Sequence, residues 1–358
     1  MTKQTSRDAG IAGRRKMRGL LCCLIALATF LLTIAVLLPT YLVPSMKKIP
    51  LDIAVNTLSV APNSSLVDMK KTAAGEAMTE NGVPLQFRVY VTVEEPANAE
   101  IATLQAAVSM SRSDRPAGDL PISASVDRVT LDRSTGMPVA DPPATVQTVQ
   151  DKPADAAVRE GLQYKFPFGT ERQSYPYFDT VARVTRPIDY LDDSRVEGGM
   201  QLYHFRQTLD PINLRLTQPD AKLTLAASAW GIPGGDEQVT FDLYYENTRD
   251  VWVEPASGAI VAVEEHLHRF LARSVDDPHA LTTLDARTTF DPATLEHTTS
   301  VAKEARTKLR WGTIYAPILL AGFGVTALAA AATLAIWASR QDRRRQHTAA
   351  PAAATEVV

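Results

Sequence analysis

The chain has 358 residues, a hydrophobic content of 45% and a formal net charge of -3. This length is enough for one large or two ordinary domains with cores of their own. The nearly balanced charge gives no indication of nucleic-acid binding. The only cysteines, Cys22 and Cys23, lie at the start of an apolar run, so no disulfide supports the rest of the chain.

The first element in chain order is the uncharged run over residues 20–43. A helix needs roughly 20 apolar residues to cross a bilayer, whereas the apolar part of a cleaved signal peptide has only about 7 to 15, so we expect a transmembrane helix. Basic residues are more numerous before the run than after it, which predicts that residues 1–19 form a cytoplasmic tail. The basic residues before the run are Arg14, Arg15, Lys16 and Arg18, and those after it are Lys47 and Lys48.

Alternating apolar residues predict several strands after the first span. Residues 51–55 and 82–95 alternate with period two, and residues 82–95 are also rich in β-branched and aromatic side chains. Further strands are expected over 101–111 and 122–131. The turn at Asp132–Gly136 should join two antiparallel strands, because its glycine can adopt a positive φ.

This turn recurs later in the chain. VTLDRSTGMPV (Val129–Val139) aligns without gaps with VWVEPASGAIV (Val251–Val261), and the two share an acid, a hydroxyl residue and a glycine. We therefore predict two structural repeats, over about 82–160 and 199–290. The alternative is that two unrelated antiparallel hairpins have similar turns.

Residues Gly161–Asp179 hold six of the twenty Phe and Tyr residues and separate the two predicted repeats. Tyr164, Phe166 and Phe168 alternate, which predicts three rings on one face of an extended segment. Two interpretations remain open: the rings fill a core, or they line a pocket.

The second half again alternates, and it predicts antiparallel strands from Leu223 to Val263. The pair Asp291-Pro292 is a typical helix start, and the helix should continue to Arg310. Residues 311–338 then form a second uncharged span, with Trp311 and Trp337 placed as in an aromatic belt. This arrangement leaves residues 44–310 outside the cytoplasm and residues 339–358 as a second cytoplasmic tail, disordered at its end.

No sequence motif identifies an enzyme. The nucleophile elbow and the glycine-rich phosphate loops are absent, so we expect no enzymatic activity and no cofactor. His266 and His268 would share one face of a strand with Glu264, and His204 could join them at a metal; a solvent-facing strand explains them better. Paired acids such as Asp192-Asp193 are equally well explained by an exposed loop.

A binding role fits a curved antiparallel sheet next to a membrane, with a lipid or glycolipid as the nearest ligand. The candidate pocket wall comprises Tyr164, Phe166, Phe168, Tyr175, Tyr177 and Trp230. The candidates for contact with an anionic head group are Lys165, Arg172 and Arg206. For the arginines, the alternative is a solvated surface position.

The chain resembles a family of actinobacterial two-pass membrane proteins, the porin-like PorA family. The segments that carry the resemblance are PTYLVPSMKKIPLD (Pro39–Asp52), LDRSTG (Leu131–Gly136), YKFPFGTERQSYPYFD (Tyr164–Asp179) and WVEPASG (Trp252–Gly258). The resemblance implies a cell-envelope role linked to the maintenance of lipomannan and lipoarabinomannan, and it brings no catalytic residues. Because outer-membrane barrels have no long apolar helices, we do not expect a pore built from strands.

The WVEPASG turn is also similar to that of periplasmic lipid carriers of the LolA and LprG kind. We therefore expect an α+β fold: a mainly antiparallel extracytoplasmic domain, built as two tandem half-barrels and tethered by two transmembrane helices to the plasma membrane. The predicted function is binding of a lipid or lipoglycan intermediate during envelope assembly. The alternatives are a periplasmic hydrolase or transferase, and a scaffold that binds an envelope glycosyltransferase.

Overall fold

The computed structural model describes residues 2–348 except 69, 70, 73, 75–78, 117, 150 and 194. The chain forms two compact units. The helical unit comprises Met1–Met46 and Thr307–Val358, and the β unit comprises Lys47–Arg306. The C-terminal residues 349–358, for which the sequence predicts disorder, lie outside the described residues.

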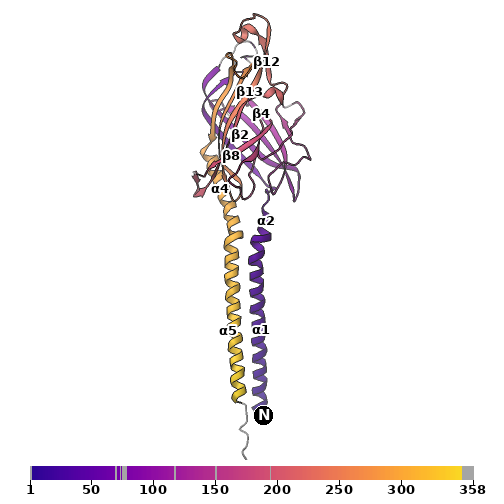
Figure 1. Cartoon of the computed structure of the whole chain (residues 1–358), viewed down its shortest axis with the longest axis vertical. Coiled ribbons are helices and arrows are strands. Elements are labelled where there is room, and N and C mark those ends of the chain that lie inside the picture. Colours follow the sequence, from indigo (N-terminus) through magenta and orange to yellow (C-terminus); the bar gives the residue numbers. More distant parts are fainter. Residues whose placement is uncertain are drawn as a thin grey trace, which may run out of the picture. The chain divides into compact units, whose positions relative to one another are not determined.

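The helical unit contains two long helices that lie side by side, α1 and α5 (Figure 1). Its elements are α1 (Thr2–Leu37), η1 (Leu38–Leu42), α2 (Val43–Met46), η4 (Trp311–Tyr315) and α5 (Ala316–Thr348). Two helical stretches are long and apolar enough to cross a membrane, Arg15–Met46 and Pro292–Gln341. Both predicted apolar spans are therefore helical.

Glycine allows α1 and α5 to approach closely. A Cβ atom added at Gly324 would lie 2.8 Å from the Leu32 side chain and 3.3 Å from the Ala28 carbonyl oxygen. A Cβ atom at Gly312 would lie 2.7 Å from Val43. Small residues at such contacts are typical of helices that pack within a membrane, and they leave no channel between this pair.

The β unit is built around one 13-stranded sheet in which all neighbouring strands are antiparallel. Its strands are β1 (Ala54–Val67), β2 (Thr79–Ala97), β3 (Ile101–Arg112), β4 (Ser123–Asp132), β5 (Thr145–Gln147), β6 (Asp155–Ala156), β7 (Tyr175–Asp179), β8 (Val184–Asp192), β11 (Tyr203–Asn213), β12 (Lys222–Ala226), β13 (Gln238–Glu254), β14 (Ala259–Ala272) and β15 (Leu281–Phe290). The strand order is β6-β5-β4-β3-β2-β1-β15-β14-β13-β11-β8-β7, with β12 paired to β13. The predicted α+β class with a mainly antiparallel sheet is confirmed.

Short elements complete the β unit. They are the hairpin β9 (Val196–Glu197) and β10 (Met200–Gln201), the 3-10 turns η2 (Leu214–Leu216) and η3 (Ala227–Trp230), and the helix α4 (Pro292–Arg310), whose residues from Thr307 onward belong to the helical unit. As predicted, Asp291 caps α4, because its carboxylate accepts a hydrogen bond from the Thr294 amide at 2.8 Å. The predicted strand over 51–55 begins later, since β1 starts at Ala54.

The sheet curves so that its two outermost strands approach each other. Val146 of β5 packs with Phe178 of β7, and Arg183 donates to Asp155 of β6 at 2.9 Å. The largest core cluster joins strands β1 to β3 with strands β11 to β15. Its buried members are Ala61, Val83, Leu85, Met110, Ala182, Leu209, Leu214, Tyr245, Leu267, Leu284 and Ala286. Side chains therefore fill the space that the sheet encloses, as in a packed core.

The sheet is continuous through β1 and β15 at its centre, so both predicted repeats contribute strands to one sheet, with the hairpin β9–β10 separate from it. The strands of the first predicted repeat lie on one side of this pair, and those of the second lie mainly on the other. The division into two tandem half-barrels of the lipid-carrier kind stays a prediction.

Candidate functional site

The two similar turns seen in the sequence have the same hydrogen bonds. In the first turn, the Asp132 carboxylate accepts the amides of Ser134 and Thr135 at 2.9 and 2.8 Å. In the second, the Glu254 carboxylate accepts the amide of Ser257 at 2.8 Å and its hydroxyl at 2.7 Å. The acid and the hydroxyl residue that the sequences share thus have a common role: they satisfy backbone donors inside the turn.

The shared glycines close both turns. Gly136 donates its amide to Asp132 O and Gly258 donates its amide to Glu254 O, both at 2.9 Å. Their φ angles are +75° and +70°, a region that favours glycine. The prediction that this turn recurs is confirmed in its geometry.

The aromatic stretch passes directly over both turns. A Cβ atom at Gly258 would lie 2.1 Å from the Phe166 carbonyl oxygen, and one at Gly136 would lie 3.3 Å from the Lys165 carbonyl oxygen. The Phe166 amide donates to Gly258 O at 3.0 Å, and the Thr170 amide donates to a carbonyl of the second turn at 2.8 Å. Glycine is therefore needed in these turns for close approach as well as for φ.

The rings of the stretch do not share one face. Phe166 is fully buried, and its ring centroid lies 4.8 Å from that of Phe205. The Tyr164 hydroxyl instead donates to the buried Asp127 carboxylate, and Phe168 lies beside Lys165. The prediction of an extended segment with three rings on one face is wrong, because the contacts with the two turns bend the chain here.

The structure brings together only part of the candidate pocket wall. Tyr175 and Tyr177 pack around Phe166, with ring centroids 5.6 and 6.1 Å from it. Trp230 belongs to another cluster, where it stacks on Phe241 at 4.0 Å. These contacts correspond to the core-packing interpretation that the sequence left open.

The two candidate arginines lie on the surface in ion pairs. Arg172 pairs with Asp193 at 3.0 Å and is 54% exposed. Arg206 pairs with Asp250 at 2.8 Å and is 46% exposed. Both arginines therefore occupy solvated surface positions, which was the alternative to contact with a head group.

Lys165 differs from the arginines because its ammonium group is largely enclosed. Its Nζ atom donates to the Phe166 carbonyl at 2.9 Å and lies 3.6 Å from the centre of the Phe168 ring. Burial lowers the pKa of Lys165 to about 7. At neutral pH the amine therefore carries only part of its usual charge.

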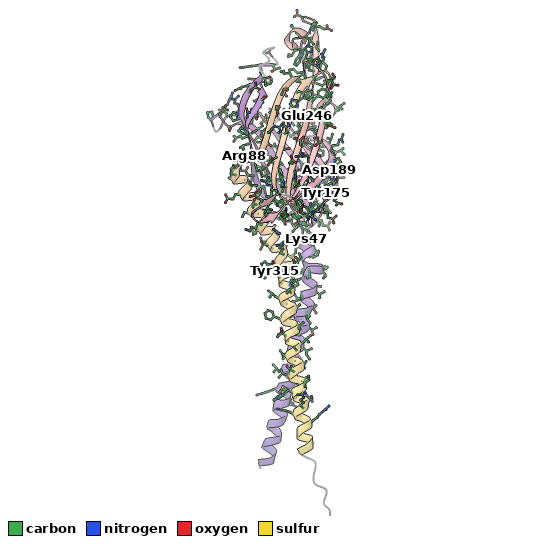
Figure 2. The ribbon with its side chains drawn as sticks, turned by 60° about the vertical axis from the view of Figure 1, so that its left-hand side comes forward. Lys47, Arg88, Tyr175, Asp189, Glu246 and Tyr315 are labelled. Carbon is green, nitrogen blue, oxygen red and sulfur yellow. The ribbon has the colours of Figure 1, made fainter. Side chains whose placement is uncertain are left out.

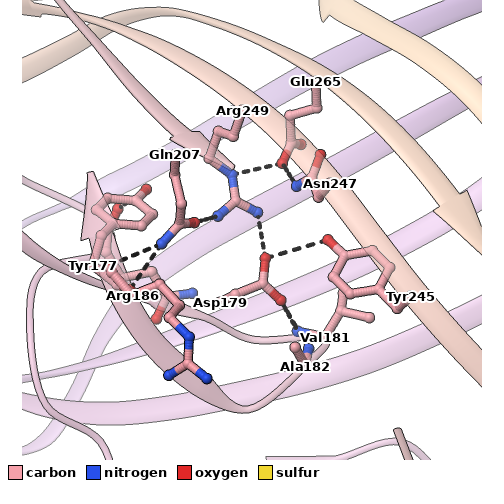
Figure 3. A network of polar contacts seen from close by, with 11 residues as sticks. Tyr177, Asp179, Val181, Ala182, Arg186, Gln207, Tyr245, Asn247, Arg249 and Glu265 are labelled. Atoms are coloured by element: carbon pink, nitrogen blue, oxygen red, sulfur yellow. Dashed lines mark hydrogen bonds and ion pairs between the residues drawn. The ribbon is translucent and has the colours of Figure 1, made fainter. Parts of the chain in front are cut away.

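A buried network of polar side chains joins the end of the aromatic stretch to the centre of the sheet (Figure 3). Asp179 is fully buried and accepts four hydrogen bonds. Two come from the amides of Val181 and Ala182 at 2.9 and 2.8 Å, one from the Tyr245 hydroxyl at 3.2 Å and one from Arg249 at 3.0 Å. Strand β7 is thereby fixed to strand β13.

Arg249 is the centre of this network. Its Nε atom donates to Glu265 at 2.6 Å, and a terminal nitrogen donates to the Gln207 side chain at 3.0 Å. Burial opposes the charge of Arg249, but the Glu265 and Asp179 carboxylates outweigh it and raise its pKa well above the usual value. Burial also raises the pKa of Tyr177, whose ring faces Arg249, to about 12.

Arg249, Asn247 and Glu265 were not among the residues predicted from the sequence, although the sequence contains a signal for the first two. In β13, Val239, Phe241, Leu243 and Tyr245 occupy odd-numbered positions, with Tyr244 as the exception at an even one, and the odd-numbered series resumes at Val251. Asn247 and Arg249 occupy the odd positions between them, so period two places both on the buried face. A charged residue in a buried alternating position indicates a buried partner.

A second buried ion pair anchors the beginning of the stretch. The guanidinium of Arg159 forms an ion pair with Asp127 of β4, and both side chains are only 2% exposed. Arg159 also lies 4.2 Å from the centre of the Phe178 ring. Burial, together with the Asp127 charge, raises the pKa of Tyr164 well above its usual value.

The three histidines considered as metal ligands are each paired with a carboxylate of a neighbouring strand. His204 contacts Asp250 at 2.6 Å, and His266 contacts Asp285 at 2.9 Å. His268 contacts Glu246 at 2.6 Å. Within the described ranges, no group of three or more His, Cys, Asp or Glu side chains could hold a metal ion.

Two shallow hollows, of about 240 and 360 Å³, lie on the described surface of the β unit. The smaller one lies between β1, β2 and the start of α4, and the larger one lies over β2 to β5. Both include Arg88, which Figure 2 labels on β2. None of the nine candidate ligand-binding residues lines either hollow.

These observations define the class of the protein: a membrane protein whose large β unit has a packed interior. A family model described as Porin PorA matches residues 20–333. A Porin PorA of Corynebacterium amycolatum is 34% identical over 306 residues, which cover 72% of this chain and 78% of that protein. A Porin PorA of Corynebacterium resistens is 32% identical over 322 residues, covering 71% of this chain and 77% of that protein. The chain belongs to the Porin PorA family.

Family membership settles several expectations. The resemblance to the PorA family is confirmed, and so are the assignment to the membrane of the cell envelope and the absence of enzymatic function. The predicted role in binding lipid or lipoglycan intermediates is wrong, because the family and both relatives are described as porins. The same finding overturns the alternative role as a glycosyltransferase scaffold.

Proposed function

We propose that the protein forms a channel for small solutes in the cell envelope and that several copies of the chain build each channel. The observation that carries this proposal is the match to the Porin PorA family over residues 20–333, which include the first uncharged run, most of the second and the whole β unit. Two relatives named Porin PorA match this chain over more than three quarters of their own length.

The need for several copies follows from packing. Within one chain α1 and α5 are in direct contact at Gly324, and η4 approaches α2 closely at Gly312, which leaves no lumen between the two long helices. The interior of the β unit is filled by its largest core cluster. A water-filled path therefore requires surfaces of more than one chain, and helices can build its wall within the membrane.

We also propose that the chain crosses the plasma membrane twice, with both termini in the cytoplasm and residues 44–310 outside. The basic residues between Arg14 and Arg18 support this orientation under the positive-inside rule. A membrane-impermeant thiol reagent tests it in intact cells. It should label Asp220→Cys, in an exposed turn of the β unit, and should not label a cysteine placed in residues 339–358.

The channel is tested with the purified full-length protein in planar lipid bilayers. Discrete conductance steps are expected, and their frequency should rise more steeply than linearly with protein concentration, because assembly precedes conduction. The protein lacking residues 47–306 serves as a comparison for the part played by the helices. Complete absence of conductance steps for the full-length protein, at any protein density, would contradict the proposal.

A further inference from the structure

The outer face of strands β2 to β5 carries an uncovered apolar patch. Cross-strand pairing places Tyr90 beside Ala107, Ala107 beside Val126, and Val126 beside Gln147, so these side chains share one face of the sheet. The neighbouring positions Val91 and Ala106 point the other way, into the core, and are buried. Within the part of the chain that the structure describes, Tyr90 and Ala107 stay exposed on this outer face.

This face is hollowed, and the lining of the hollow is nearly free of charge. The hollow of about 360 Å³ has eleven lining residues, of which only Arg88 is charged. At its margins Tyr90 is 46% exposed and Val149 is 47% exposed. Ile122, which continues the outward face of β4, is 44% exposed. Few charges, with Tyr and Arg present, are typical of the centre of a protein interface.

We propose that this face, called the β2–β5 face below, docks onto the same face of a second copy of the chain. The choice of a second copy rests on the proposed function, since a channel that no single chain can enclose needs contacts between copies. The shape supports the same choice. Ala107, Ser109 and Ala124 form a floor of small residues next to the projecting Tyr90 ring.

In a dimer whose twofold axis passes through this floor, each Tyr90 ring packs against Ala107, Ser109 and Ala124 of the other copy. Such a contact is self-complementary, as a twofold interface must be. Four strands about 4.8 Å apart and about five residues long cover roughly 300 Å², against about 800 Å² per partner in a typical stable complex. The contact is therefore weak in free solution, and confinement of both copies to one membrane raises their effective concentration.

The test uses the full-length protein in lipid vesicles, with Cys22 and Cys23 both replaced by serine. Ala107→Cys places a thiol in the floor, and Thr208→Cys places one on the exposed outward side of β11 as a matched control. A short bis-maleimide should convert the Ala107→Cys protein to covalent dimers much faster than the Thr208→Cys protein. Equal rates at equal protein density would overturn the proposal.

A second variant separates docking from chance collision. Ala124→Arg, added to Ala107→Cys, puts a charge on the floor at a position that is exposed in the monomer, so folding should be preserved. The dimer yield should fall about tenfold, which corresponds to only ~1.4 kcal/mol of association free energy. An unchanged yield would show that the β2–β5 face is not the contact.

Conductance measured on the same preparations distinguishes this inference from the proposed function. Cross-links through Ala107→Cys without conductance would support the docking and contradict the channel. Conductance with cross-links no higher than the Thr208→Cys control would support the channel and contradict the docking. Capture of another envelope protein in place of a second copy would also overturn the inference.

Discussion

Replacement of Arg249 by methionine should strongly destabilise the β unit. Asp179 is fully buried, and Arg249 is its only cationic partner among the described residues. Glu265, 21% exposed, relies on the same guanidinium. Arg249→Met thus leaves two carboxylates in a poorly solvated place without a counter-charge, a change that typically costs about 3–5 kcal/mol.

The free energy of unfolding is measured by urea titration of the full-length protein in detergent, followed by the circular dichroism of the sheet. The matched control is Arg172→Met, which breaks a solvent-exposed pair with Asp193 and should therefore change the free energy of unfolding far less than Arg249→Met. If Arg249→Met costs as little as the control, the argument from burial is refuted.

A double variant tests whether unpaired buried carboxylates cause the loss of stability in Arg249→Met. Asp179→Asn in the Arg249→Met background removes one of the stranded charges, so its cost should be smaller than in the wild-type background. The amide can still accept hydrogen bonds from Val181 and Ala182. Equal costs in both backgrounds would mean that the two side chains are not energetically coupled.

Three further predictions concern other contacts. Gly258→Ala should lower the melting temperature of the full chain by more than Gly235→Ala, since both have positive φ but only Gly258 touches a neighbouring backbone. Lys165 has a pKa of about 7 in the folded protein, below its usual 10.5. Below about pH 7 the folded protein bears the full free-energy cost of burying the charged amine, whereas above about pH 10.5 the amine is neutral in both the folded and the unfolded state and this cost is absent. Lys165→Met should therefore be more stable than the wild type at pH 7, with a difference that shrinks as the pH rises to 10.5; a pH-independent difference would exclude this cause. Gly324→Val should separate α1 from α5, measured as a longer distance between spin labels on the two helices, whereas Gly322→Val, which has open space, should not.

Local patterns in the sequence were enough to predict most of the fold. Period-two alternation identified β2, β3 and β4 because each has one face in the core and one toward solvent. The start of α4 was predictable because a cap acts within four residues. The recurrent turn was predictable for the same reason, since its acid, hydroxyl and glycine interact with each other.

The candidate site depended on contacts between distant segments, which local patterns do not show. Asp179 and Arg249 are 70 positions apart and meet only after β7 has joined the sheet. Phe166 lies in the core because its backbone is bound to Gly258. A ring-rich segment has the same local pattern whether its rings face a cavity or a core, so the sequence left both interpretations open.

Under the proposed function, the packed interior and the solute path belong to different parts of the protein. The two repeated turns and the Asp179–Arg249 network use buried polar groups to hold the aromatic stretch, so changes there act on stability. Solutes instead pass between copies, along surfaces that are exposed in the single chain. Under this proposal the β unit acts as a rigid body that sets contacts between copies through the β2–β5 face, and the selectivity of the channel should be sought at exposed positions of α1 and α5.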